Sequence, residues 1–274
     1  MVDLLIVVAT GEADAGDAGD LLSRHGAASV EHRSWGRGHV IVSGGPFEAE
    51  AAAAVAALVR AAGWPADVRP TGGGHLMAWQ THTAPTVVSD RLWVCFPWSE
   101  FDRDRAPLLV DIDPVRAFGT GAHPSTLLIL RWLADHVTIA DTVLDVGCGS
   151  GVLAVAAAVL GARRVTAVDI DPAAVFATLG NATRNRVTID ASAQPVPAIA
   201  GLFDVVVANI GAATLVELSD ALADRVAPGG HLVLSGMSPA QISRVAAAFP
   251  GMELVESPAI EDWSAAVLRV APVS

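Results

Sequence analysis

In the second half of the chain, short apolar runs alternate with segments of helical periodicity. The runs contain many valines and few polar residues, at 142–146, 164–169 and 203–208. Such runs are typical of strands buried on both faces of a parallel sheet. The segments that separate them are predicted helices, at 151–160, 172–185 and 214–226. This rhythm predicts a doubly wound, mostly parallel α/β domain.

The same pattern predicts the flanking elements of this domain. Residues 108–112 read as a strand and 124–136 as a helix, before the regular alternation begins. Beyond it, residues 231–235 read as a strand and 239–249 as a helix. The last apolar segments, 252–257 and 265–270, are close enough in sequence to form a closing hairpin. We therefore place the α/β domain at 108–274.

The first 70 residues have a different pattern. Their apolar segments predict four strands, at 4–9, 28–35, 39–43 and 66–69, and two helices, at 17–25 and 46–62. The order β-α-β-β-α-β matches a small ferredoxin-like α+β domain. We expect this domain at 1–70 and a linker at 71–107, which contains Thr71-Gly-Gly-Gly74 and then many aromatic residues.

A glycine turn follows the predicted strand at 142–146. Residues 143–151 read V-L-D-V-G-C-G-S-G, which places Gly147, Gly149 and Gly151 two residues apart after Asp145. A strand that ends in a glycine turn and continues as a helix is the first half of a nucleotide-binding βαβ unit. Asp169 ends the next predicted strand, where a carboxylate can accept hydrogen bonds from ribose hydroxyls. The sequence predicts a ligand that carries a nucleoside.

The glycine turn alone leaves NAD and S-adenosylmethionine open. Residues 149–154 satisfy G-x-G-x-x-A, and Asp169 stands where an NAD-binding acid would. Three features favour S-adenosylmethionine: the full pattern D-x-G-x-G-x-G, the polar Asn209 at the end of the next strand, and the closing hairpin in place of a second mononucleotide-binding half. Ligands in open α/β sheets bind at the carboxyl ends of the strands, where Asn209 lies.

Composition restricts the partners. The net charge is −12 and there is no lysine, so the sequence argues against a broad nucleic-acid surface and favours a basic protein partner. Cys95 and Cys148 have no metal-site or disulfide spacing, and we expect no metal. No basic leader and no long apolar span occur, so we expect a soluble, cytoplasmic monomer with no membrane contact.

Residues 113–126 carry a more specific motif. They read D-P-V-R-A-F-G-T-G-A-H-P-S-T, which resembles the signature of the bacterial ribosomal protein L-eleven methyltransferases. The family's other motifs are matched by G-C-G-S-G-V-L-A at 147–154, V-D-I-D-P at 168–172, A-N-I at 208–210 and L-S-G-M at 234–237. The resemblance covers Trp79 to the C-terminus, while the N-terminal domain is similar only in its predicted element order.

The resemblance implies a class I, S-adenosylmethionine-dependent methyltransferase that modifies lysine side chains or the N-terminal amine of a large-subunit ribosomal protein. Asn209 is the implied catalytic residue, because its side chain can accept a hydrogen bond from the amine. The residues implied in cofactor binding are Thr126, Gly147, Asp169 and Asn209, and with them Gly149, Gly151, Phe118, Thr120 and Ile170.

Other residues near these motifs have two interpretations. His123 is a candidate general base, but its place before Pro124 favours a structural role. The chain has no tyrosine, so an aromatic cage for a cationic amine would have to use tryptophan or phenylalanine. The candidates are Trp93, Phe96, Trp98 and Phe118. Alternatively, the aromatic residues of the connector cover a seam between domains.

The acceptor is the least determined part of the prediction. The chain has Gly211 where the family usually has leucine or a similar residue, and A-N-I-G replaces the N-P-P-Y of many amino methyltransferases. A methyltransferase that acts on another protein or on a small molecule therefore remains open. An NAD-dependent oxidoreductase or a silent nucleotide-binding module is the alternative from another class.

Overall fold

The computed structural model describes the backbone of residues 2–8, 29–35, 38–47 and 66–70, and residues 57, 60, 61, 84–113 and 121–271. The chain divides into two compact units. The larger unit comprises Thr83–Ile210 and Thr214–Ser274, and the smaller one contains the first four strands.

The smaller unit contains a four-stranded antiparallel sheet. Its order is β2-β3-β1-β4, built from β1 (Val2–Val8), β2 (Ser29–Trp35), β3 (Gly38–Phe47) and β4 (Ala66–Pro70). This order agrees with the predicted ferredoxin-like plan. The predicted helix at 17–25 lies outside the described residues. The predicted start of the second helix is wrong, because Pro46 and Phe47 belong to β3. Ala57, Arg60 and Ala61 are helical, as predicted.

An eight-stranded sheet forms the larger unit. Its order is β10-β9-β8-β11-β12-β15-β13, with β14 beside β15. The strands are β8 (Thr142–Val146), β9 (Arg164–Val168), β10 (Asp190–Ser192), β11 (Phe203–Asn209), β12 (Val226–Met237), β13 (Met252–Glu256), β14 (Ala259–Ile260) and β15 (Trp263–Val270). Strands from β10 to β12 pair in parallel, whereas β15 is antiparallel to its neighbours. The predicted doubly wound sheet and closing hairpin are therefore confirmed.

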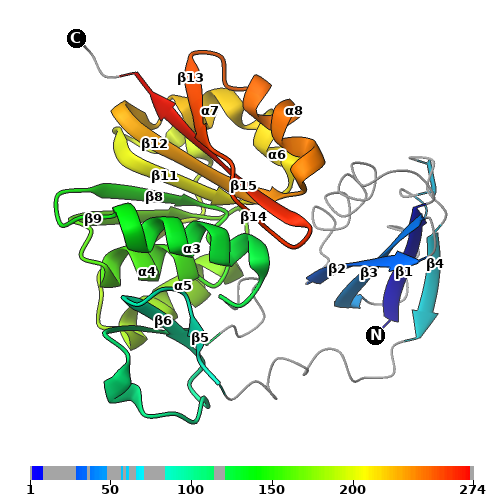
Figure 1. Ribbon diagram of the computed structural model, residues 1–274, viewed down its shortest axis with the longest axis horizontal. Helices are drawn as coiled ribbons and strands as arrows, with labels where there is room; N and C mark the ends of the chain where they lie inside the picture. Colours follow the sequence, from blue (N-terminus) through cyan, green and yellow to red (C-terminus); the bar gives the residue numbers. More distant parts are fainter. Residues whose placement is uncertain are drawn as a thin grey trace. The chain divides into compact units, whose positions relative to one another are not determined.

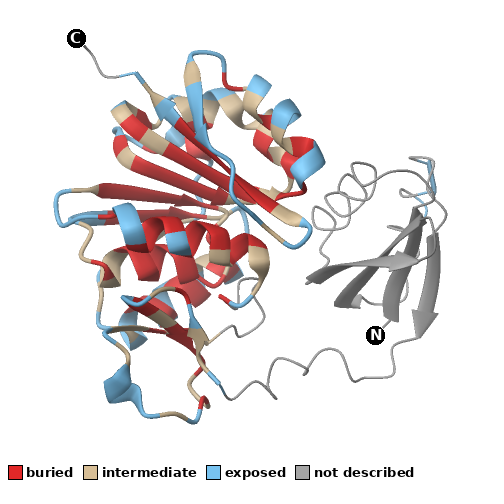
Figure 2. Ribbon diagram, viewed as in Figure 1, coloured by how far each residue is buried: buried red, intermediate tan, exposed pale blue. Residues whose placement is uncertain are grey.

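Helices cover both faces of this sheet. Figure 1 shows α3 (Pro124–His136), α4 (Val152–Val159) and α5 (Pro172–Arg184) on one face, and α7 (Ser219–Ala223) and α8 (Ile242–Ala247) on the other. The central strands are buried, while the edge strand β13 is mostly exposed (Figure 2). The predicted helix at 214–226 is interrupted: α6 (Ala212–Glu217) is followed by α7, and β12 already begins at Val226.

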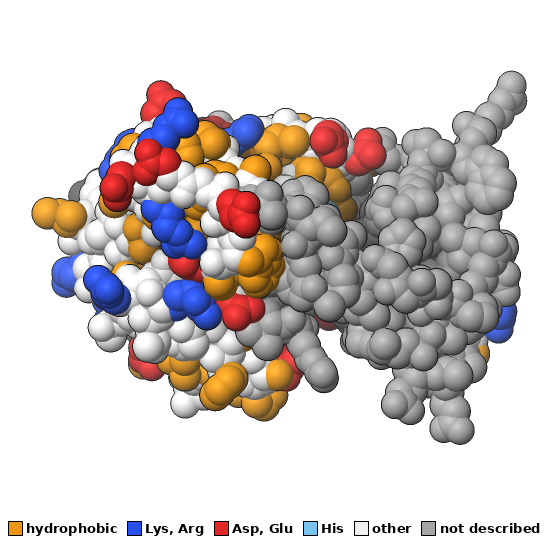
Figure 3. All heavy atoms as spheres, turned by 90° about the horizontal axis from the view of Figure 1, so that it is seen from below, with side chains coloured by type: hydrophobic (Ala, Val, Ile, Leu, Met, Phe, Trp, Pro, Cys, Tyr) orange, Lys and Arg blue, Asp and Glu red, His pale blue; other side chains and the backbone are white. Residues whose placement is uncertain are grey.

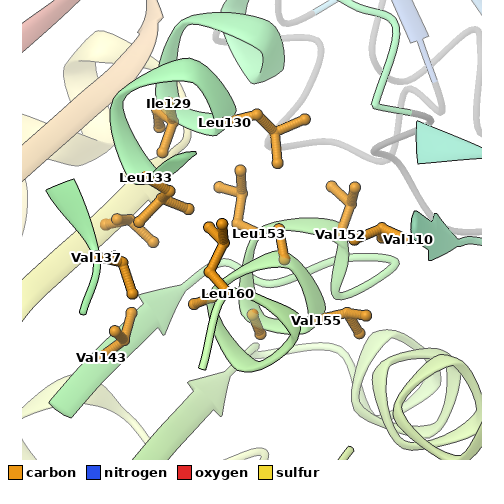
Figure 4. Packing of buried hydrophobic residues seen from close by; sticks show 14 of the residues in the cluster. Val110, Ile129, Leu130, Leu133, Val137, Val143, Val152, Leu153, Val155 and Leu160 are labelled. Carbon is orange, nitrogen blue, oxygen red and sulfur yellow. The ribbon is translucent and has the colours of Figure 1, made fainter. Parts of the chain in front are cut away.

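The core of the larger unit is densest between α3, α4 and β8. Figure 4 shows Leu130 and Leu133 of α3 facing Leu153 of α4 and Leu160, the residue that ends this helix, with Val143 of β8 below them. None of these five residues is more than 7% exposed. Burial of an aliphatic side chain contributes roughly 1.5–3 kcal/mol, so this packing fixes α4 on β8. It also fixes the glycine turn that joins them.

Residues 84–113 add a small separate sheet to this unit. Its strands are β5 (Thr86–Val87), β6 (Leu92–Cys95) and β7 (Leu108–Asp111), and β6 pairs in parallel with β7. Leu92, Val94 and Val110 are at most 1% exposed and belong to the same core as α3 and α4. Much of the stretch expected to be a connector therefore packs against the α/β unit. The strand predicted at 108–112 exists, but it does not join the main sheet.

No helix in the described part of the chain is long and apolar enough to cross a membrane.

Candidate functional site

The strand order places the predicted site residues at one edge of the sheet. From β8 the chain builds outward to β9 and β10, then crosses to the other side of β8 to form β11. The topological switch point therefore lies between β8 and β11. Open α/β sheets bind ligands at the carboxyl ends of the strands at this point. The glycine turn follows β8 there, and Asn209 ends β11.

The glycine turn bends back over the end of β9. The amides of Gly147 and Cys148 both donate to the carbonyl oxygen of Val168, at 2.8 and 3.1 Å. Gly147 has φ +74°, and a Cβ atom there would lie 2.5 Å from Cγ2 of Ile210. Only glycine combines this backbone conformation with so close an approach of the neighbouring segment. The turn is therefore packed against the residue that follows β11, and the β8–β11 edge has no room for a side chain at position 147.

Asp169 is held beside the turn by two backbone amides. Gly149 N donates to Oδ2 at 3.0 Å, and Asp171 N donates to Oδ1 at 3.0 Å. Each carboxylate oxygen keeps a further lone pair with which it can accept a hydroxyl hydrogen bond. The next residue, Ile170, is 91% exposed. A carboxylate with a fixed orientation next to an exposed apolar side chain can bind a ribose and the flat face of its base.

Asp145 is buried in β8 directly before the turn. Oδ2 accepts from Ala154 N at 3.1 Å, and the side chain is 1% exposed. Oδ1 has no hydrogen-bond partner among the described residues. Burial raises the pKa of Asp145 to about 7; the charge of Asp169 adds to the shift and the Ala154 amide opposes it. Such an orphaned acceptor is costly unless a ligand or water satisfies it.

Thr126 and Asn209 meet across 83 residues of sequence. Asn209 Nδ2 donates to Thr126 Oγ1 at 3.0 Å. Thr126 lies in the first turn of α3 and is 1% exposed. This bond uses the amino end of the Asn209 amide, so its carbonyl oxygen is the end able to accept from another donor.

His123 begins α3 instead of pointing freely into the site. It is the N-cap residue of α3, where Nδ1 accepts from Ser125 N and lies 2.8 Å from Ser125 Oγ. Its ring makes an edge-to-face contact with that of Trp263, at 4.7 Å between centroids. These contacts favour the structural interpretation of His123 over that of a general base.

The aromatic residues of the connector pair with one another. Phe96 stacks on Trp98 at 5.1 Å between centroids, and Trp93 lies 6.1 Å from Phe101. Phe96 is only 5% exposed, which leaves it little surface for an amine. Phe118 and Thr120 lie outside the described residues. Among the described residues no cluster of histidine, cysteine, aspartate or glutamate could hold a metal ion.

The buried face of α5 was missed at the level of sequence. Thr178 and Asn181 are 0 and 2% exposed, and both bond to the glycine turn. Thr178 Oγ1 lies 3.2 Å from both Gly149 O and Cys148 Sγ. Burial raises the pKa of the Cys148 thiol to about 12, with the charge of Asp145 as the next cause. Polar residues at 178, 181 and 185, whose spacing places them on one side of the helix, were the available signal.

Taken together, the doubly wound sheet, its antiparallel β15 and the glycine turn at the switch point define the class I methyltransferase fold. The family model described as "Ribosomal protein L11 methyltransferase (PrmA)" matches residues 75–270. The chain belongs to this family. The match favours the methyltransferase interpretation over the NAD-dependent alternative.

Individual relatives agree with the family model. A "Ribosomal protein L11 methyltransferase" of Citrifermentans bemidjiense is 45% identical over 199 residues, which is 70% of this chain and 65% of that protein. The similarly described protein of Dechloromonas aromatica is 47% identical over 185 residues, 67% of this chain and 62% of that protein. The chain thus matches slightly less than two thirds of the length of these relatives.

A solved structure is similar as well. The crystal structure of ribosomal protein L11 methylase from Lactobacillus delbrueckii subsp. bulgaricus has a TM-score of 0.63 and 26% identity. The similarity covers 68% of this chain and 98% of that one.

Proposed function

We propose that this protein is an S-adenosylmethionine-dependent N-methyltransferase that modifies amines of a large-subunit ribosomal protein. The observation that carries the proposal is the edge between β8 and β11. There a glycine turn, an amide-oriented Asp169 and a buried Asp145 with an unpartnered oxygen lie on one side, and the Thr126–Asn209 pair on the other.

The residues at this edge fit the chemical parts of the cofactor. Asp169 would accept from the ribose hydroxyls, and the exposed Ile170 would pack against the adenine. Gly147 would bring the backbone close to the methionine part. Oδ1 of Asp145 supplies a buried acceptor for a donor at that end. When bound, the cofactor supplies an electrophilic methyl group on a positively charged sulfur.

Asn209 would orient the acceptor amine. Since its Nδ2 is bonded to Thr126, its Oδ1 is left to accept a hydrogen from the amine, which directs the nitrogen lone pair. A lysine amine has an ordinary pKa of about 10.4 and must lose a proton before it can react. An apolar surrounding lowers that pKa because desolvation disfavours the ammonium. We assign positioning to Asn209, and no residue to the role of general base.

The printed descriptions of the relatives name ribosomal protein L11, and we propose that protein as the acceptor. A net charge of −12 fits a basic protein partner. On the face drawn in Figure 3, arginine and carboxylate side chains of the described residues lie among one another, so that face offers no continuous basic surface for nucleic acid. Because a ribosomal acceptor is found in the cytoplasm, we propose that the enzyme acts there, as a monomer.

Calorimetric titration with S-adenosylmethionine and with NAD tests the cofactor. We expect binding of S-adenosylmethionine alone, and about a hundredfold weaker binding in Asp169→Ala, which lacks both ribose acceptors. Asp171→Asn is the matched control: asparagine still caps α5, and one negative charge is removed two residues away. Binding of NAD in place of S-adenosylmethionine would reject the proposal.

Mass spectrometry of purified large-subunit ribosomal proteins, after incubation with enzyme and cofactor, tests the acceptor. We expect added methyl mass on L11. A cofactor-binding enzyme that leaves L11 unmodified would instead point to the same chemistry on another protein or a small molecule.

A further inference from the structure

A stripe of polar side chains lies along the buried face of α5. Thr178, Asn181 and Asn185 recur at intervals of three and four residues, so they lie on one side of the helix. Thr178 and Asn181 are at most 2% exposed. Buried polar side chains are retained only where their hydrogen bonds are satisfied.

Asn181 bonds to two segments of the chain at once. Its Oδ1 accepts from Asp113 N at 2.9 Å, and its Nδ2 donates to Asp113 O and to Ser150 O, both at 2.9 Å. Ser150 belongs to the glycine turn. Asp113 is the first residue of the motif D-P-V-R-A-F-G-T-G-A-H-P-S-T. One buried amide therefore connects the cofactor turn to the start of the most specific motif in the sequence.

Asn185 makes a similar contact one turn later, with the last residue of β7, and its Nδ2 also donates to Asn181 O at 2.8 Å. It accepts from Asp111 N at 2.8 Å and donates to Asp111 O at 2.7 Å. No hydrogen bond of Asn185 to the glycine turn occurs among the described residues. Asn185 is thus an internal reference: like Asn181 it joins α5 to the segment 111–113, but it lacks the bond to the glycine turn.

The glycine turn packs directly on this stripe. A Cβ atom on Gly151 would lie 2.8 Å from the side chain and 2.9 Å from the Cα atom of Thr178. Thr178 Oγ1 lies 3.2 Å from Gly149 O, while Gly149 N is the donor to Asp169. The peptide groups around Gly149 and Ser150 are therefore held by α5 on one side and by Asp169 on the other.

From these contacts we infer that Thr178 and Asn181 are positioning residues that hold the glycine turn in its ligand-binding conformation. Neither needs to touch the cofactor. They act through Gly149 and Ser150, and Asn181 also sets where the motif beginning at Asp113 starts relative to the turn. This inference rests on the proposed function for the identity of the ligand, but not for the geometry of the turn.

Calorimetry with S-adenosylmethionine on the full chain compares Asn181→Ala with Asn185→Ala. We expect Asn181→Ala to weaken binding about tenfold and Asn185→Ala to change it by less than about twofold, although both lower the unfolding temperature. In the methylation assay the KM for the cofactor should rise in Asn181→Ala, with kcat within about twofold of wild type. Equal shifts in binding for the two variants would overturn the inference.

Thr178→Val is the second variant, should Asn181→Ala fail to fold. Valine keeps the shape of threonine and removes the hydroxyl, and we expect binding to weaken about threefold because one proton is shared between sulfur and carbonyl. Unchanged binding in Thr178→Val would remove Thr178 from the inference.

Hydrogen exchange of the ligand-free protein separates this inference from the proposed function. The amides of Gly149 and Gly151 should exchange several-fold faster in Asn181→Ala than in Asn185→Ala. If wild type does not bind S-adenosylmethionine but this difference is present, the proposed cofactor is wrong and the positioning role stands. If wild type binds but the exchange rates are equal, the positioning role is wrong.

Discussion

Two aspartates on neighbouring strands show how the two edges of the main sheet differ: the edge where the parallel strands begin and the edge where they end. Asp204, near the start of β11, accepts from both the backbone amide and the hydroxyl of Thr142 through Oδ2, each at 2.8 Å. Asp145, near the end of β8, accepts one amide through Oδ2, and its Oδ1 has no partner among the described residues. The first carboxylate accepts two hydrogen bonds from the fold through one oxygen, whereas the second is left short of hydrogen bonds at the edge proposed to bind the cofactor.

The pKa values of these two aspartates shift in opposite directions, as the difference in hydrogen bonding predicts. Desolvation raises the pKa of Asp204, but the two hydrogen bonds from Thr142 and the charge of Arg163 outweigh it, so the net shift is downward. At Asp145 burial dominates, and the pKa rises to about 7. The start of β11 is therefore stabilised by hydrogen bonds, whereas the end of β8 keeps a buried acceptor unsatisfied, a loss of stability that is common at functional sites.

The largest expected effect on stability comes from adding a methyl group at Gly151, and the same addition at Gly201, at the other edge, is its control. Gly151→Ala forces φ +80° on alanine and pushes its Cβ atom into Thr178, whose Cα would lie 2.9 Å away. We expect a loss of roughly 3 kcal/mol in the free energy of unfolding. Gly201→Ala is the control: φ is +89°, but the nearest atom is Arg164 Nη2 at 3.8 Å, so only about 1 kcal/mol is lost. Urea denaturation measures both, and equal losses would contradict the comparison.

The second largest effect is a dependence of the free energy of unfolding on pH, caused by Asp145. A pKa of about 7 in the folded state, against about 3.9 in the unfolded chain, means that the native protein binds more protons between these values. Asp145 therefore lowers stability as pH rises from about 4 to 7, by at most roughly 1.4 kcal/mol per pH unit. Asp145→Asn removes this dependence, so its stability relative to wild type should increase between pH 5 and pH 7 in urea titrations. A constant difference over that range would show that Asp145 titrates normally.

The same substitution at the other edge should have the opposite sign. Asp204→Asn keeps the shape of the side chain but removes the charge that strengthens both Thr142 bonds, and we expect a loss of about 1 kcal/mol at pH 7. Because the folded-state pKa of Asp204 is lowered, the advantage of wild type should disappear as pH falls below about 4. A stabilising effect at pH 7 would contradict the contrast between the two aspartates.

The smallest effect on stability concerns a contact between the exposed Arg164 and the buried Phe203, where β9 and β11 begin. The Arg164 guanidinium lies 5.2 Å from the ring centroid of Phe203. At an exposed site such a pair contributes about 0.5 kcal/mol. Arg164→Leu should therefore lower the midpoint of thermal unfolding by only about 1–2 °C and leave S-adenosylmethionine binding unchanged. Weaker binding of S-adenosylmethionine in this variant would mean that contacts where the strands begin influence the site where they end, which would contradict the comparison.

The residues at the carboxyl ends of the parallel strands were easier to predict from sequence than those where the strands begin. Glycines at alternate positions, Asp169 after a buried run and Asn209 at the end of the next all lie at strand ends, and parallel strands bring those ends together. The Thr142–Asp204 bond joins residues 62 apart that carry no motif, so nothing in the sequence distinguishes it from two exposed polar residues.

Two local misreadings have physical reasons. Pro46 looks like the first residue of a helix, because proline is favoured there, but it continues β3. The run Leu108–Asp111 is apolar whichever sheet it joins, so its pattern gave no sign that it pairs with β6 in a separate sheet. Asn181 was missed because its three partners are set by tertiary packing and not by spacing along the chain.

Because Cys148 is buried inside the glycine turn, the reactivity of its thiol reports on the opening of that turn. A thiol that is 6% exposed and has a pKa of about 12 reacts with alkylating reagents only when the turn opens. The rate of alkylation therefore measures how often the binding edge opens. Cys95 is buried in β6, which is not part of the turn, and can serve as the reference thiol in the same molecule.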